Sequence, residues 1–176
     1  MPLRTIRKPI TAIGVLLTVG LLFMLALAGS ARSTPPVTVT PVPLARGTIA
    51  DGFKIHVDGI KINVAGPVDV ALAHLTFPPG GTTGWHAHPG VTLVAVKRGT
   101  VTRILANGCT RESFQAGQGF VEQPNAVHMV RNEGTMPAET IVTFIVPVGA
   151  KVLTPEPAPA GCNAGGLHPT GRPSGR

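Results

Sequence analysis

The sequence predicts an all-β fold, either a sandwich or a barrel. Short runs rich in Val, Ile, Thr and Phe alternate with turn residues at a spacing of about 8–12 residues, as in all-β domains. No amphipathic helix of convincing length interrupts these runs. We expect strands at residues 53–57, 60–64, 68–77, 91–96, 100–105, 112–115, 119–123, 127–131 and 138–146.

The first 31 residues have the pattern of an export leader. Three basic side chains in the first eight residues precede an uncharged apolar run at residues 11–29, which predicts an N-terminal hydrophobic helix. Ala26 and Ala28 form an A-x-A pattern typical of signal-peptide cleavage sites. A run of about 19 apolar residues can also span a bilayer, so an uncleaved membrane anchor is the alternative. Either assignment places the rest of the chain outside the cytoplasm, secreted or membrane-anchored, with membrane contact only through residues 1–31.

Proline-rich segments flank the predicted β domain. Residues 32–43 form a Pro/Thr spacer, which we expect to be extended. Residues 44–153 contain the predicted strands and form the barrel domain. Residues 154–176 are a Pro/Gly-rich tail whose composition cannot build a hydrophobic core.

The basic residues do not form a nucleic-acid-binding surface, although the formal net charge is +7. Three of the positive charges lie in the leader, which leaves 12 basic against 8 acidic side chains. The remaining lysines and arginines are scattered, with little aromatic interleaving. We therefore expect no nucleic-acid partner.

The chain has two cysteines, Cys109 and Cys162. Neither lies in a C-x-x-C pair or beside a histidine, so a zinc knuckle or a redox motif is not indicated. In an oxidising compartment they are expected to form one disulfide. Closing a loop of about fifty residues would stabilise the fold by about 4 kcal/mol and tie the tail to the domain.

Three histidines form the main functional signal. His86 and His88 are one residue apart, so in an extended strand their side chains point to the same face. Two imidazoles placed in this way can bind one cation. His128 follows forty residues later, just after the turn dipeptide Pro124-Asn125, and opens a predicted strand.

In this spacing the sequence resembles the cupin superfamily, over about residues 68–147. The first cupin motif matches at Gly80, His86, His88 and Gly99, and the second at Gly117, His128 and Asn132. Two positions depart from the motifs. Thr92 stands where the first motif has a glutamate ligand, and Gln123-Pro124-Asn125 replaces the Pro-x-Gly of the second. Asn is tolerable there because, after Gly, it adopts left-handed conformations most readily.

The resemblance implies a small single-domain cupin, an antiparallel double-stranded β-helix or jelly-roll barrel. It implies one divalent metal held by His86, His88 and His128, with Thr92 beside it, holding a water or lining the pocket. Three neutral imidazoles without a carboxylate suit Fe(II), Zn(II), Cu(II) or Ni(II) better than Mn(II). Glu122 could supply a base or a substitute ligand only if its side chain faces inward, and we do not expect this. The alternative is a degenerate, metal-free cupin whose histidines merely line a polar pocket.

Fold does not select the chemistry, so several functions stay open. The first is a metalloenzyme of oxygenase, isomerase or lyase type that acts on a small molecule. The second is a binding module that holds a small-molecule ligand without turnover, and it gains support from the absence of tyrosine and the scarcity of charged residues. The sequence leaves substrate and metal unspecified. The resemblance is compatible with a homodimer, of which the sequence gives no direct sign.

Overall fold

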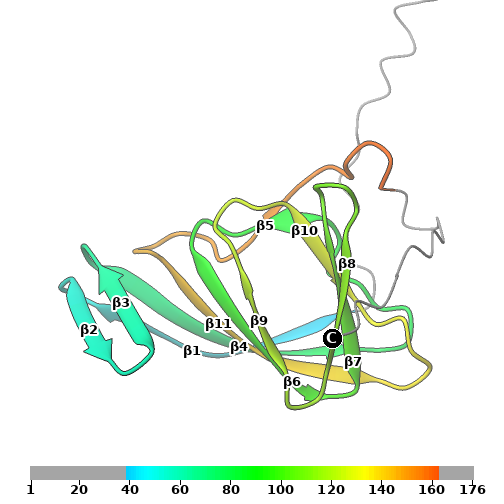
Figure 1. Ribbon diagram of the computed structural model, residues 1–176, viewed down its shortest axis with the longest axis horizontal. Helices are drawn as coiled ribbons and strands as arrows, with labels where there is room; N and C mark the ends of the chain where they lie inside the picture. The colour runs from blue at the N-terminus through cyan, green and yellow to red at the C-terminus, as the bar shows by residue number, and fades with distance from the viewer. Residues whose placement is uncertain (1–38, 163–176) are drawn as a thin grey trace, which may run out of the picture. The chain divides into compact units, whose positions relative to one another are not determined.

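The computed structural model describes residues 39–162, where every helix-or-strand element is a β-strand and all strand pairs are antiparallel (Figure 1). Among these residues there is no helix long and apolar enough to cross a membrane. The hydrophobic helix predicted at the N-terminus and most of the predicted tail lie outside the described residues.

Two five-stranded sheets and a separate hairpin make up the fold. The first sheet has the order β1 (Thr40–Ile49), β4 (Val68–Phe77), β11 (Ala138–Pro147), β6 (Val91–Arg98) and β9 (Gly119–Glu122). The second has the order β12 (Thr154–Pro155), β5 (His86–Ala87), β10 (His128–Arg131), β7 (Thr100–Leu105) and β8 (Arg111–Gln115). The hairpin joins β2 (Phe53–Val57) to β3 (Ile60–Val64). Strands that are distant in sequence lie side by side, which is the arrangement of a jelly roll.

The hydrophobic core lies between the two sheets. Along β11 every second residue is buried, from Ala138 to Val146, so one face of this central strand points inward. Phe77, Val94 and Phe144 from the first sheet pack in one cluster with Val101 and Val130 from the second. The inner faces of both sheets are therefore buried against each other, and side chains from the two sheets are in contact.

Every strand expected from the sequence is present, with ends within two residues of the expected ones, but three strands were not anticipated. β1 begins at Thr40, inside the stretch predicted as a spacer, and it contains Pro41 and Pro43. Proline is tolerated there because β1 is an edge strand, paired only with β4. β5 and β12 have two residues each, too few to show an alternating pattern, and β12 lies at the start of the predicted tail. The limits of the predicted domain, residues 44–153, stay a prediction.

Candidate metal centre

Neighbouring strands of the second sheet bring the three histidines together. His86 on β5 pairs directly with His128 on β10, and His88 lies just beyond the end of β5. The ring centroids of His86 are 4.4 Å from His128 and 4.8 Å from His88, and those of His88 and His128 are 5.2 Å apart. All three side chains are buried. One ring nitrogen of each histidine lies within 4.8 Å of the others, so the cluster is compact enough to hold one cation.

Backbone carbonyl groups orient all three rings. Each Nδ1 lies within hydrogen-bond distance of a carbonyl oxygen, and because such an oxygen can only accept, the proton of the neutral ring is on Nδ1. The acceptors for His86, His88 and His128 are Gly84, Val152 and Ala126, at 2.9, 2.6 and 2.8 Å respectively. Each Nε2 is therefore left with its lone pair available, as a metal ligand requires.

A hydrogen bond joins the turn that precedes His128 to the segment that carries His88. The Asn125 backbone N–H donates to the carbonyl oxygen of His88 at 2.8 Å, three residues before His128. Asn125 has a φ of 58°, the left-handed conformation expected for this position of the second motif. The departure from Pro-x-Gly therefore leaves the shape of the turn intact.

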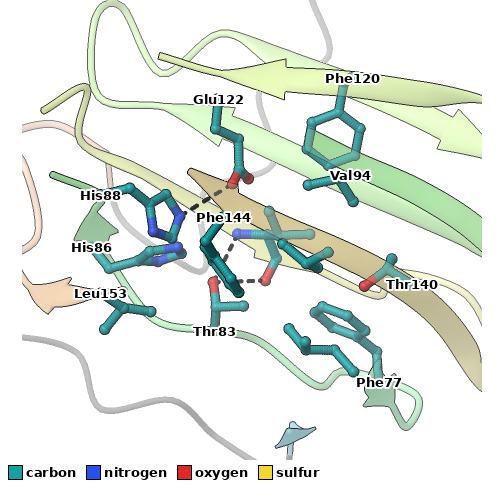
Figure 2. A pocket seen from close by; sticks show the side chains of 13 residues that line it. Phe77, Thr83, His86, His88, Val94, Phe120, Glu122, Thr140, Phe144 and Leu153 are labelled. Atoms are coloured by element: carbon teal, nitrogen blue, oxygen red, sulfur yellow. Dashed lines mark hydrogen bonds and ion pairs between the residues drawn. The ribbon is translucent and has the colours of Figure 1, made fainter. Parts of the chain in front are cut away.

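Glu122 faces the histidines from the opposite sheet (Figure 2). It ends β9 and is 4% exposed. Its Oε2 lies 3.1 Å from Nε2 of His88, and its Oε1 lies 3.0 Å from Nε2 of His128. Both Nε2 atoms are buried, and neither has a partner in hydrogen-bond geometry. The two contacts are therefore close but not aligned as hydrogen bonds. The carboxylate and the two imidazoles thus converge without pointing directly at each other.

Two groups of the cluster, His86 and Glu122, have pKa values lowered from their usual ranges. Burial, together with the charges of His128 and His88, lowers the pKa of His86 to about 3, so this ring is neutral near pH 7. Burial alone would raise the pKa of Glu122, but its contacts with His128 and His88 outweigh burial and hold the pKa at about 2. A buried carboxylate among imidazole lone pairs is an environment that attracts a cation.

A cavity of about 50 Å³ adjoins these side chains. Its walls are mostly apolar, as Figure 2 shows for the side chains around His86 and His88. Among the described residues, its polar lining consists of the hydroxyl groups of Thr83 and Thr140, the rings of His86 and His88 and the carboxylate of Glu122. The apolar lining residues are Leu75, Phe77, Val94, Phe120, Val130, Val142, Phe144 and Leu153.

Thr92 was expected beside the metal, holding a water or lining the pocket, and this role stays a prediction. It is fully buried, yet it is not among the residues that line the cavity. Its two partners in register, Phe144 on β11 and Glu122 on β9, line the cavity in its place. Glu122 is the site residue that sequence reasoning undervalued. The signal that could have found it is alternation along β9, where Phe120 and Glu122 are buried and Val121 is exposed.

The segment from Val152 to Cys162, here called the C-terminal strap, runs beside the histidines. Val152 supplies the carbonyl that orients His88, and Leu153 lines the cavity. β12 then pairs with β5, and the Glu156 N–H donates to the carbonyl oxygen of Trp85 at 2.9 Å. A disulfide between Cys162 and Cys109 ends the strap, in agreement with the pairing predicted from the sequence.

The donor set fits a divalent transition metal. It offers three imidazole nitrogens whose second nitrogens are already bonded to the backbone, which is the usual arrangement of histidine ligands. The three-histidine cluster agrees with the sequence expectation, while the choice of metal is not determined by these contacts.

Comparison with known proteins relates this region to cupins. The family model for the cupin domain matches residues 73–144. Germin-like protein subfamily 2 member 1 of Arabidopsis thaliana is 33% identical over 79 residues, which cover 43% of this chain and 36% of that protein. Germin-like protein 5-1 of Oryza sativa subsp. japonica is 28% identical over 102 residues, covering 56% and 44% respectively. The chain thus spans less than half the length of these relatives.

Two solved structures illustrate the likeness. A cupin-like protein from Thermotoga maritima has a TM-score of 0.45 and 22% identity, covering 51% of this chain and 65% of that one. An oxalate oxidase in complex with the substrate analogue glycolate has a TM-score of 0.38 and 27% identity, covering 42% and 40%. Residues 73–144 match the cupin domain and contain both histidine motifs, so this part of the chain is a cupin domain.

Proposed function

We propose that this chain binds one divalent metal through His86, His88 and His128 and uses it to bind and transform a small molecule. One observation carries the proposal: all three Nδ1 atoms are bonded to backbone carbonyl groups, and the three rings converge in a buried cluster. Orienting three imidazoles in this way has a cost in side-chain entropy that a metal-binding role explains.

The residues around the histidines have separable tasks. The carbonyls of Gly84, Val152 and Ala126 hold the rings in one tautomer. Phe144 packs against His88 with ring centroids 5.4 Å apart and helps to exclude water from the cluster. A divalent metal bound here would supply Lewis-acid chemistry to a ligand that enters the cavity.

The cavity indicates the chemical class of that ligand. No lysine or arginine among residues 39–162 lines it, so a multiply charged anion would have no counter-ion from this part of the chain. The Thr140 Oγ1 is buried without a hydrogen-bond partner and is therefore available to a ligand. A volume of about 50 Å³ has room for only a few water-sized groups. We infer a small ligand of low polarity with one metal-binding group.

A second candidate is a binding module without turnover. The lining of the cavity supports it, because apart from the two histidine rings Glu122 is the only titratable side chain that the described part of the chain contributes to it. Acid–base catalysis commonly needs a further donor or acceptor near the reacting atoms. Oxygen consumption by the iron-loaded protein across a panel of thiols and diketones separates the two: turnover supports the enzyme, and metal-dependent ligand binding without turnover supports the module.

The metal itself is tested by elemental analysis of untagged protein purified without added metal. We expect close to one equivalent of a transition metal in the wild type. His128→Ala should lose it, because two imidazoles remain and the cluster opens. His56→Ala, on the exposed strand β2, is the matched control and should keep the wild-type content. Equal metal content in the wild type and in His128→Ala would refute the site and favour the metal-free alternative.

We also propose that the domain works outside the cytoplasm. The disulfide between Cys109 and Cys162 supports this location, because such bonds persist in oxidising compartments. The leader-like pattern of residues 1–31 supports it independently.

A further inference from the structure

We propose that Glu122 is the fourth ligand of the metal, so that the carboxylate missing at position 92 comes from the neighbouring strand. This inference rests on the proposed metal site and adds a residue to it. It changes the donor set from three neutral imidazoles to three imidazoles and one carboxylate.

The distances around Glu122 match those between ligands of a shared cation. Two ligands that bind one ion at right angles, each at about 2.1 Å, stand about 3.0 Å apart. The measured separations are 3.1 Å from Oε2 to His88 Nε2 and 3.0 Å from Oε1 to His128 Nε2. In that arrangement the lone pair of each Nε2 points between the donor atoms rather than at the carboxylate. This accounts for both Nε2 atoms having close oxygen neighbours and no aligned hydrogen bond.

The register between β6 and β9 explains why a carboxylate at position 122 can replace one at position 92. Thr92 on β6 and Glu122 on β9 are direct partners in the antiparallel ladder. Side chains of direct partners lie on the same face of the sheet, with Cβ atoms about 5 Å apart. Both side chains are buried, and the Thr92 Oγ1 has no hydrogen-bond partner. A carboxylate at either position therefore faces the histidines of the opposite sheet.

Glu122 also alters which metal the site prefers. A carboxylate lowers the formal charge of the metal centre from 2+ to 1+ and adds a hard oxygen donor, which suits Mn(II) and Fe(II). The sequence-based ranking placed Mn(II) last because it assumed no carboxylate at the site. With Glu122 as a ligand, Mn(II) and Fe(II) become the favoured metals.

Calorimetric titration of full-length, metal-free protein with Mn(II) and with Zn(II) tests this. The wild type should bind both. Glu122→Gln keeps the size of the side chain and removes its charge, so we expect Mn(II) affinity to fall about 100-fold or more and Zn(II) affinity only about tenfold. Asp58→Asn, in the exposed turn between β2 and β3, is the matched control and should bind like the wild type.

The reciprocal exchange of Thr92→Glu with Glu122→Thr tests the register argument. The double variant should bind Mn(II) within about tenfold of the wild type, whereas Glu122→Thr alone should not, because the carboxylate returns to the same face. Loss of binding in the single variant without recovery in the double variant would overturn the relocation.

The titrations give different results if Glu122 is not a ligand and if the metal site itself does not exist. Wild-type affinity for Mn(II) in Glu122→Gln overturns Glu122 as a ligand and leaves the three-histidine site standing. A wild-type protein that binds neither metal overturns the site itself. If the variants do not fold, infrared difference spectra of the wild type with and without Mn(II) decide: a shifted carboxylate stretch supports the inference, and an unshifted one refutes it.

Discussion

Gly90, two residues after His88, lies closer to the backbone of β11 than any side chain would allow. A Cβ atom at this position would be 2.0 Å from the carbonyl oxygen of Ile145 and 2.9 Å from the Cα atom of Val146. These are backbone atoms of a central strand, so they cannot rotate aside. The loop that carries His88 is therefore pressed against the first sheet, which helps to position His88 opposite Glu122.

Replacing Gly90 with alanine should disturb both stability and the metal site. We expect Gly90→Ala to lower the free energy of unfolding by about 1–3 kcal/mol, because the added methyl group forces the loop away from β11. The same shift should weaken metal binding through His88. Gly47→Ala is the control, since a Cβ atom there meets nothing within 4 Å. Urea denaturation of both variants is the measurement, and equal midpoints would contradict the close packing.

At the scale of elements, the C-terminal strap connects the disulfide to the candidate metal site. The strap orients His88 through the Val152 carbonyl and pairs with β5 through β12. Its end is held by the disulfide, and Cys162 packs in a buried cluster with Trp85 and Met129. The disulfide therefore holds a segment whose other end bonds to His88, a candidate metal ligand.

Removing the disulfide should consequently weaken metal binding as well as the fold. For the double variant Cys109→Ser with Cys162→Ser, we expect stability to fall by up to about 4 kcal/mol. We expect metal affinity to fall about tenfold, the usual size of effect when a partner of a metal-bound histidine is lost. Titration of the folded variant with Zn(II) measures this. Unchanged affinity alongside lower stability would show that the strap holds the fold but not His88.

At the scale of the whole molecule, burial couples the histidine cluster to the pH dependence of stability. The folded chain keeps His86 neutral down to about pH 3, whereas in the unfolded chain this ring takes up a proton near pH 6.5. Because the pKa is lower in the folded state, the unfolded state binds more protons between these limits. Stability contributed by the buried neutral ring is therefore complete above pH 6.5 and is lost as pH falls toward 3.

A second group acts at lower pH. Asp69 accepts hydrogen bonds from Thr48 at 2.6 Å, from the Gly149 N–H at 2.9 Å and from Arg46 at 2.6 Å. These bonds lower its pKa to about 2. Its contribution is present above pH 3.8 and is lost as pH falls toward 2, so the carboxylate extends acid sensitivity beyond the range of His86.

We expect the metal-free protein to lose stability steadily from pH 6.5 downward, by about 1.4 kcal/mol per pH unit at most from one histidine. His86→Gln should flatten the slope between pH 6.5 and 3, because the variant removes the proton that the unfolded state takes up. His56→Gln, on an exposed strand, should leave the slope near that of the wild type. Urea unfolding in the presence of a chelator, measured across this range, checks the prediction, and parallel slopes for all three proteins would contradict it.

The sequence alone determined the parts of this protein that depend on local pattern. Alternation of apolar residues between turns located the long strands, because a half-buried strand must repeat every two residues. The resemblance of the His86, His88 and His128 spacing to the cupin motifs predicted the cluster, and the structure pairs His128 directly with His86. β1 escaped notice because its prolines argue against a strand, and only its place at the sheet edge makes them acceptable.

Only the tertiary structure decided where the carboxylate lies and what holds the rings. Thr92 and Glu122 are thirty residues apart, and their pairing depends on the register between β6 and β9, which no local pattern specifies. The Val152 carbonyl reaches His88 because the C-terminal strap crosses β5, a contact made through two short paired strands. Local spacing determines which side chains share one face of a strand. The register between strands and the packing of the two sheets determine which faces meet, and the position of Glu122 as the candidate fourth ligand depends on these.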